Sequence, residues 1–253
     1  MARVLVIVPF PMDAENLDNR RAQLRSVRLG PGVDFDFRPV RFAPKGYVSQ
    51  QDSVLADLGI LEAGLSAQTE GYDAVCIDTM SDSGMIQLRA AMGIPVIGPG
   101  RHAMLSALML GDRFSILTMW DKWRHLYAKT LAELGLGARC ASVRSAGLQP
   151  DNQNLMAGKE DAFFPALLTA GRACVEEDGA DVIILGSTTM HEAHGYLAER
   201  LPVPVINPGP LTYRLAITAV RLGYSHSRSA YTAPKVSPIE RMRALGDATE
   251  SQT

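Results

Sequence analysis

Several features that direct a protein to a particular partner or compartment are scarce in this sequence of 253 residues. Its three cysteines, Cys76, Cys140 and Cys174, form neither a CxxC pair nor a metal-binding spacing, so we expect buried packing thiols in a reducing compartment. No apolar run approaches the roughly 18 residues that span a bilayer. The formal net charge of −2 leaves no electrostatic footprint for nucleic acid or an anionic membrane.

The start of the chain, MARVLVIVPFP, does not favour a signal peptide, because Pro9 and Pro11 interrupt a short apolar run. It is typical of the first strand of a sheet. With 47% hydrophobic and 21% charged residues, the chain can bury a sizeable core. We therefore expect a cytoplasmic protein of one large domain or two small ones.

Two stretches of the sequence match each other. Residues 73–84 read DAVCIDTMSDSG, and residues 181–191 read DVIILGSTTMH. Each runs from an acidic residue through a short apolar segment, as in a strand covered on both faces, into a group of small hydroxyl residues. A helix-like stretch, a PVI strand and a Pro-Gly turn follow both copies. The match predicts an internal repeat.

The alternation of strands and helices predicts an α/β fold with two similar, doubly wound parallel-sheet halves that face each other across a central cleft. We assign residues 1–110 plus 209–222 to the first half and 111–208 to the second. Polar residues dominate 223–253, so we expect this tail to be extended or partly disordered. The expected strands are 3–8, 33–40, 74–78, 113–118, 139–143 and 182–186, together with the two PVI strands at 95–97 and 204–206. The expected helices are 16–29, 53–68, 83–92, 100–110, 120–134, 163–177, 191–199 and 210–222. The loop 145–158 could cover a pocket.

Hydroxyl side chains follow both repeat strands. Ligands of open α/β sheets bind at the carboxyl ends of strands, and a helix start offers free N–H groups to carboxylates and oxyanions. We therefore expect the two hydroxyl groups to hold a small anion between the two copies. The residues concerned are Thr79, Ser81, Ser83, Ser187, Thr188 and Thr189.

The order of several motifs resembles the aspartate/glutamate racemase superfamily, and is most similar to its hydantoin and allantoin racemase branch. The motifs are D-A-x-x-I-x-x-x-x-D-x-G, PVIG and LGxRFSxLT, followed by DVIILGxxxM and VPVI. The resemblance covers most of residues 1–222. It implies cofactor-independent chemistry, in which two cysteines on opposite sides of the substrate remove and return the proton α to a carbonyl. Thr79 and Ser187 stand at those positions here, so both family thiols are absent.

This departure changes the expected chemistry. A thiol titrates near 8.5, whereas an aliphatic hydroxyl acts as a base or nucleophile only when another group takes its proton. His191, four residues beyond Ser187, is the leading candidate for that group, and packing or capping beside the helix is its alternative role. His191 and His194 are one residue short of the HExxH spacing and have no obvious third ligand, so we expect no metal.

Other candidates for substrate contact also lie at strand ends. Thr118 and Trp120 follow the first strand of the second half, and Asn207 opens the turn after the second PVI strand. Pro11 ends the first strand, where the resemblance implies an Asn-Pro element that meets substrate. Asp82 either orients Thr79 or, as its residue type favours, caps the next helix.

Three functions follow from these observations. The first is a cofactor-independent racemase or isomerase that acts α to the carbonyl of a small carboxylate or cyclic amide. The second is a hydrolase or lyase of a small amide, imide or carboxylate that uses Ser187 assisted by His191. The third is a non-catalytic protein that binds small anions. We expect a homo-oligomer with a small-molecule substrate and no cofactor, nucleic acid or membrane partner.

Overall fold

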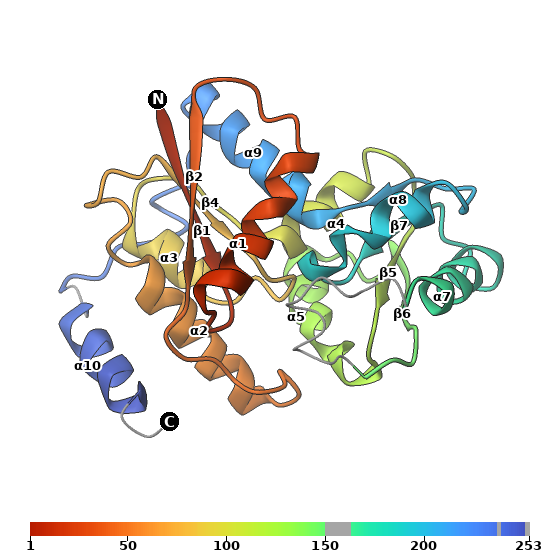
Figure 1. Cartoon of the computed structure of the whole chain (residues 1–253), viewed down its shortest axis with the longest axis horizontal. Helices are drawn as coiled ribbons and strands as arrows, with labels where there is room; N and C mark the ends of the chain where they lie inside the picture. Colours follow the sequence, from red (N-terminus) through yellow and green to blue (C-terminus); the bar gives the residue numbers. More distant parts are fainter. Residues whose placement is uncertain (150–162, 237–238, 251–253) are drawn as a thin grey trace. The chain divides into compact units, whose positions relative to one another are not determined.

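The computed structural model describes residues 1–149, 163–236 and 239–250 (Figure 1). Contacts divide the chain into two compact units, one formed by Met1–Gly98 with Thr212–Thr253 and the other by Pro99–Leu211. Each unit contains one four-stranded parallel sheet with helices packed on it. The predicted α/β class with two similar parallel-sheet halves is therefore confirmed.

The sheet of the first unit has the strand order β2-β1-β3-β4. Alternate side chains of its central strands lie in two separate hydrophobic cores, one on each face of the sheet, because successive side chains of a strand point to opposite faces. Val75 and Ile77 of β3 pack with α2 and α3, whereas Ala74 and Cys76 pack with Tyr213 of α9. The elements are β1 (Ala2–Val8), β2 (Val33–Pro39), β3 (Ala74–Ile77), β4 (Val96–Ile97), α1 (Ala14–Ala22), η1 (Gln23–Ser26), α2 (Gln50–Gly64), α3 (Met85–Ala91), most of α9 (Pro208–Leu222) and α10 (Ile239–Glu250).

The second unit repeats this order as β6-β5-β7-β8. Ile183 and Leu185 of β7 lie in a core with Leu167 and Cys174 of α7, and α4 contacts β7. The elements are β5 (Phe114–Thr118), β6 (Cys140–Ser145), β7 (Val182–Leu185), β8 (Val205–Ile206), α4 (Pro99–Ala107), η2 (Asp121–Trp123), α5 (His125–Leu134), α7 (Phe164–Glu176), η4 (Thr188–His191) and α8 (Ala193–Ala198).

The repeat extends to individual hydrogen bonds before β3 and β7. Asp73 accepts a bond from the Arg3 backbone N–H at 2.8 Å and donates its own N–H to the Arg3 carbonyl at 2.8 Å. Asp181 makes the same two bonds with Arg113, both at 2.9 Å. Each aspartate therefore fixes the register of its strand against the first strand of its unit.

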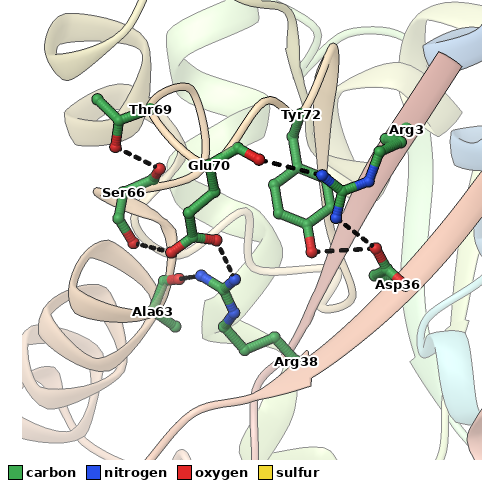
Figure 2. Close-up of polar contacts among 8 residues, drawn as sticks. All are labelled: Arg3, Asp36, Arg38, Ala63, Ser66, Thr69, Glu70 and Tyr72. Atoms are coloured by element: carbon green, nitrogen blue, oxygen red, sulfur yellow. Dashed lines mark hydrogen bonds and ion pairs between the residues drawn. The ribbon is translucent and has the colours of Figure 1, made fainter.

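Arginines on β1, β2 and β6 also pair with the segments that lead into β3 and β7. In the first unit, the Arg3 guanidinium lies 4.4 Å from the centre of the Tyr72 ring, and Arg38 pairs with Glu70 (Figure 2). In the second unit, Arg144 contacts Asp178 at 2.6 Å, and this contact lowers the pKa of the Asp178 carboxyl. The pairs are partly exposed, so each stabilises its unit only modestly.

Two expectations about the chain's organisation differ from the structure. Residues 99–107, assigned to the first half, form α4 in the second unit, where Arg101 pairs with Glu133 of α5 at 3.1 Å. The tail 223–253, which was expected to be extended or partly disordered, contains the helix α10. Met242 packs on the core beside α2, and Asp247 pairs with Arg41 at 2.6 Å, so these contacts stabilise α10 against its polar composition.

Candidate functional site

The first hydroxyl group lies directly after β3. The Thr79 Oγ1 and Ser81 Oγ atoms are 3.1 Å apart, and Ser81 Oγ lies 2.8 Å from Ser83 Oγ. Thr79 and Ser81 are partly buried, and Ser83 is buried. The three hydroxyls therefore form one hydrogen-bonded chain at the carboxyl end of the sheet, as predicted from their spacing after the strand. We name residues 79–83 the first hydroxyl cluster.

A tight backbone turn connects this cluster to α3. Asp82 and Gly84 have φ values of 52° and 69°, in the left-handed region. The N-cap of α3 is Gly84, whose N–H donates to the Asp57 carboxylate of α2 at 2.9 Å. The expectation that Asp82 caps the helix was therefore wrong. A side chain at Gly84 would meet Ile60 at 2.7 Å, so the turn needs glycine for space as well as for its conformation.

The second hydroxyl cluster, residues 187–189, follows β7 in the same way. Ser187 is the N-cap of η4, and its Oγ accepts a bond from the Thr189 N–H at 3.2 Å and lies 2.8 Å from Thr189 Oγ1. Thr188 is buried, whereas Ser187 and Thr189 are partly exposed. The cap matches the residue preference at helix starts. Both units thus place paired hydroxyls at the ends of equivalent strands.

Tyr127 of α5, which sequence reasoning did not select, holds the end of β7. Its hydroxyl donates to the Gly186 carbonyl at 2.6 Å and lies 3.0 Å from Thr118 Oγ1. Thr118 is fully buried, and its hydroxyl is engaged by Tyr127. Gly186 is required here, since a Cβ would lie 2.7 Å from the Tyr127 hydroxyl and 2.9 Å from the Leu117 carbonyl. The side chain of Thr118 therefore has a structural contact with Tyr127, and its contact with substrate stays a prediction.

In the part of the chain that the structure describes, the Ser187 hydroxyl pairs with Thr189 and not, as predicted, with His191. Both bonds of the Ser187 hydroxyl go to Thr189, and His191 is not among its partners in the described part of the chain. Asn207 donates its side-chain N–H to the His191 carbonyl at 3.2 Å, which brings two predicted site residues together. His194 is bound to the Val205 carbonyl at 3.0 Å. Over residues 1–149, 163–236 and 239–250, no three or more His, Cys, Asp or Glu side chains gather as metal ligands would.

The remaining predicted residues lie in loops after β1 and β5. Trp120 packs edge to face on Trp123, with Lys122 5.0 Å from its ring centre. Pro11 is exposed beside Phe10, whose ring packs on Tyr47. The buried Tyr47 hydroxyl donates to the Pro9 carbonyl at 3.1 Å, and burial raises its pKa. Tyr47 thus fixes the loop after β1, a contact that no local sequence pattern indicates.

A buried ion pair lies beside the first hydroxyl cluster. Arg20 of α1 binds both carboxylate oxygens of Asp78, with Nε–Oδ2 at 2.6 Å and Nη2–Oδ1 at 2.8 Å. Sequence reasoning missed Arg20, because it lies 58 residues from Asp78 in the chain. Among the residues that the structure describes, no helix combines the length and apolar character needed to cross a bilayer.

Comparison with known proteins gives consistent matches. The family model for Asp/Glu/hydantoin racemases matches residues 17–216. The chain is 30% identical over 236 residues to a hydantoin racemase of Paenarthrobacter aurescens, covering 92% of this chain and 97% of the relative. It is 29% identical over 216 residues to a hydantoin racemase of Pseudomonas sp. (strain NS671), covering 84% of each. The crystal structure of an allantoin racemase from Pseudomonas fluorescens has a TM-score of 0.83 and 26% identity, covering 93% of this chain and 98% of that one.

Proposed function

Because the chain belongs to the Asp/Glu/hydantoin racemase family, we propose that it exchanges the proton on the carbon α to a carbonyl in a small cyclic amide or carboxylate, without a cofactor. The observation that carries the proposal is the equivalent placement of the two hydroxyl clusters, each directly after the third strand of its sheet. Thr79 and Ser187 occupy the positions that the family resemblance assigns to two thiols. A small cyclic amide of the hydantoin type is the substrate class that the named relatives favour.

The hydroxyls are better suited to stabilising the negative charge that forms in this reaction than to removing the proton. Removal of the α proton places negative charge on the carbonyl oxygen, and prearranged hydrogen-bond donors stabilise that charge. We assign this role to hydroxyls that are already paired within their own cluster, Thr79 with Ser81 in the first and Ser187 with Thr189 in the second. Ser83 supports Ser81 at 2.8 Å.

The proton itself needs a stronger base than a hydroxyl. We assign this role to His191, because a neutral imidazole accepts protons near pH 7. Asn207 binds the His191 backbone and thereby holds the end of η4. Within this proposal His191 receives the proton from substrate directly, since the Ser187 hydroxyl is bonded to Thr189. The same bonding gives no support to a Ser187 nucleophile activated by His191.

Deuterium exchange tests the proposal. The substrates are single enantiomers of 5-substituted hydantoins and of allantoin, and, separately, achiral substituted malonates. Each is incubated with the protein in D2O, and the α position is followed by proton NMR. We expect label to enter without net breakdown of at least one hydantoin. Thr79→Val, Ser187→Ala and His191→Gln should each lower the exchange rate by about 10²-fold or more. The exposed Thr169→Val is the matched control and should leave the rate unchanged.

Two results would count against the proposal. Breakdown of substrate that Ser187→Ala abolishes would assign a hydrolase or lyase. Saturable binding of these compounds with neither exchange nor breakdown would assign a binding protein. The proposed homo-oligomer and cytoplasmic location are separate predictions, which light scattering of the purified protein and cell fractionation would check.

A further inference from the structure

The residue immediately before Thr79 carries a buried charge. The Asp78 and Arg20 side chains are 1% and 8% exposed, and the guanidinium binds the carboxylate through two parallel contacts of 2.6 and 2.8 Å. Burying two charges costs desolvation energy, so such a pair is weak evidence for stability, and in some proteins it specifies one arrangement of the chain. A bidentate arginine contact restricts both the position and the orientation of a carboxylate. The pair therefore fixes the end of β3 where the first hydroxyl cluster begins.

The surroundings of the pair keep it rigid. Cys76, two residues earlier on β3, packs in the core with Tyr213 of α9, which is 1% exposed. Burial raises the pKa of Tyr213, and the nearby Asp78 carboxylate raises it further. Asp78 also donates its backbone N–H to the Ile7 carbonyl of β1 at 3.0 Å. Side-chain and backbone contacts thus hold Asp78 from α1 and from β1.

The second unit holds the corresponding residue with a neutral group. Gly186 directly precedes Ser187, as Asp78 precedes Thr79. Its carbonyl accepts the Tyr127 hydroxyl at 2.6 Å, and its N–H donates to the Leu117 carbonyl of β5 at 2.8 Å. Tyr127 belongs to α5, the α-helix between β5 and β6, just as Arg20 belongs to α1, the α-helix between β1 and β2. The two contacts are therefore equivalent in topology although their chemistry differs.

We propose that Arg20 and Tyr127 are positioning residues, each holding the residue before Thr79 or Ser187 from the α-helix between the first two strands of its unit. The role of Thr79 and Ser187 in this inference rests on the proposed function, whereas the restraint on the two strand ends does not. Small displacements of a reacting group cost rate even when substrate binding survives. Loss of either contact should therefore lower kcat while leaving KM nearly unchanged.

Amide hydrogen exchange tests the restraint without any assay of activity. In Arg20→Met, exchange over residues 79–84, which include the Asp82 N–H bound to the Thr79 carbonyl, should accelerate by about tenfold or more, with the rest of the chain unchanged. Arg20→Lys keeps the charge without the bidentate contact and should give an intermediate increase. Tyr127→Phe should produce the same local effect over residues 186–192.

Matched controls separate position from chemistry. Arg21→Met removes a neighbouring arginine that is 47% exposed and pairs with Asp18, and Tyr196→Phe removes the hydroxyl of a tyrosine that stacks on Phe164. Neither should alter exchange in the two segments. If Arg20→Met fails to fold, the double variant Arg20→Met/Asp78→Leu removes both charges and should fold while still loosening residues 79–84.

The outcomes are decisive in each case. Unchanged local exchange, or an increase spread evenly over the chain, would overturn the inference. So would local loosening without loss of kcat in a protein that exchanges the α proton. If the wild-type protein does not exchange the α proton of any substrate, the proposed function is refuted. The amide hydrogen-exchange rates would still decide whether Arg20 and Tyr127 restrain the strand ends.

Discussion

Thr79 and Ser187 stand where the family resemblance implies two thiols, and a hydroxyl in that place differs from a thiol most of all in its acidity. A free thiol has a pKa near 8.5 and therefore supplies some thiolate at neutral pH, whereas an aliphatic hydroxyl supplies almost no alkoxide. The cysteines that the chain does contain offer no substitute. Burial raises the pKa of Cys76 and Cys174 and raises the pKa of Cys140 to about 11. The hydroxyl clusters can therefore donate hydrogen bonds, but a separate base must take the proton.

Restoring both thiols tests this argument. The double variant Thr79→Cys/Ser187→Cys should exchange the α proton of a hydantoin in a manner that depends on thiol ionisation. We expect the rate to rise by more than about tenfold between pH 6.5 and 8.5, because the thiolate fraction grows over that window. The control is Thr169→Cys/Thr218→Cys, which places thiols at two exposed positions whose hydroxyls bind local helix carbonyls. An equal rise in the control would refute the assignment of positions 79 and 187.

At the scale of elements, the sequence predicts what is local and misses what is distant. The apolar run 74–77 and the hydroxyls after it are neighbours in the chain, so the strand and the first cluster followed from spacing alone. Asp57, which binds the Gly84 N–H, lies 27 residues away, and Tyr127 lies 59 residues from Gly186. Such partners become neighbours only after the helices pack. The expectation for the tail failed for a related reason, since average composition over 223–253 conceals the one face of α10 that Met242 buries.

The segment after α9 contacts the carboxyl end of α3 through Arg228. The Arg228 guanidinium donates to the Arg89, Ala90 and Met92 carbonyls at the end of α3, at 2.6, 2.9 and 2.5 Å. These carbonyls lack partners within the helix, and a cation at a helix C-terminus also meets a favourable dipole.

Arg228→Ala should therefore lower the free energy of unfolding by about 1–2 kcal/mol. Chemical denaturation followed by circular dichroism measures this change. The exposed Arg241→Ala in α10 serves as the control and should change stability by less than about 0.5 kcal/mol. A loss no larger than that of the control would show that Arg228 does not stabilise α3.

At the scale of the whole molecule, the duplicated units are not consecutive stretches of chain. The second unit begins at Pro99, and the chain returns to the first unit at Thr212, within α9. Tyr213 and Ala216 of α9 bury one face of the first sheet against Val4, Val6 and Cys76. The first unit is therefore complete only after the second has been made, although its four strands all precede residue 98.

This order of assembly predicts how truncation acts. A chain ending at Leu211 lacks the part of α9 that covers Val4, Val6 and Cys76, so the first unit should lose its cooperative unfolding transition and bind a hydrophobic dye. A chain ending at Val236 lacks α10, whose contacts include the partly buried Met242 and the pair of Asp247 with the partly exposed Arg41. That chain should fold, with a midpoint of thermal unfolding only a few degrees lower, about 2–4 °C per kcal/mol lost. Calorimetry of both chains measures the difference. A cooperative first unit in the shorter chain would mean that β1 and β3 can be covered without α9, and the contacts of Tyr213 would then be dispensable for folding.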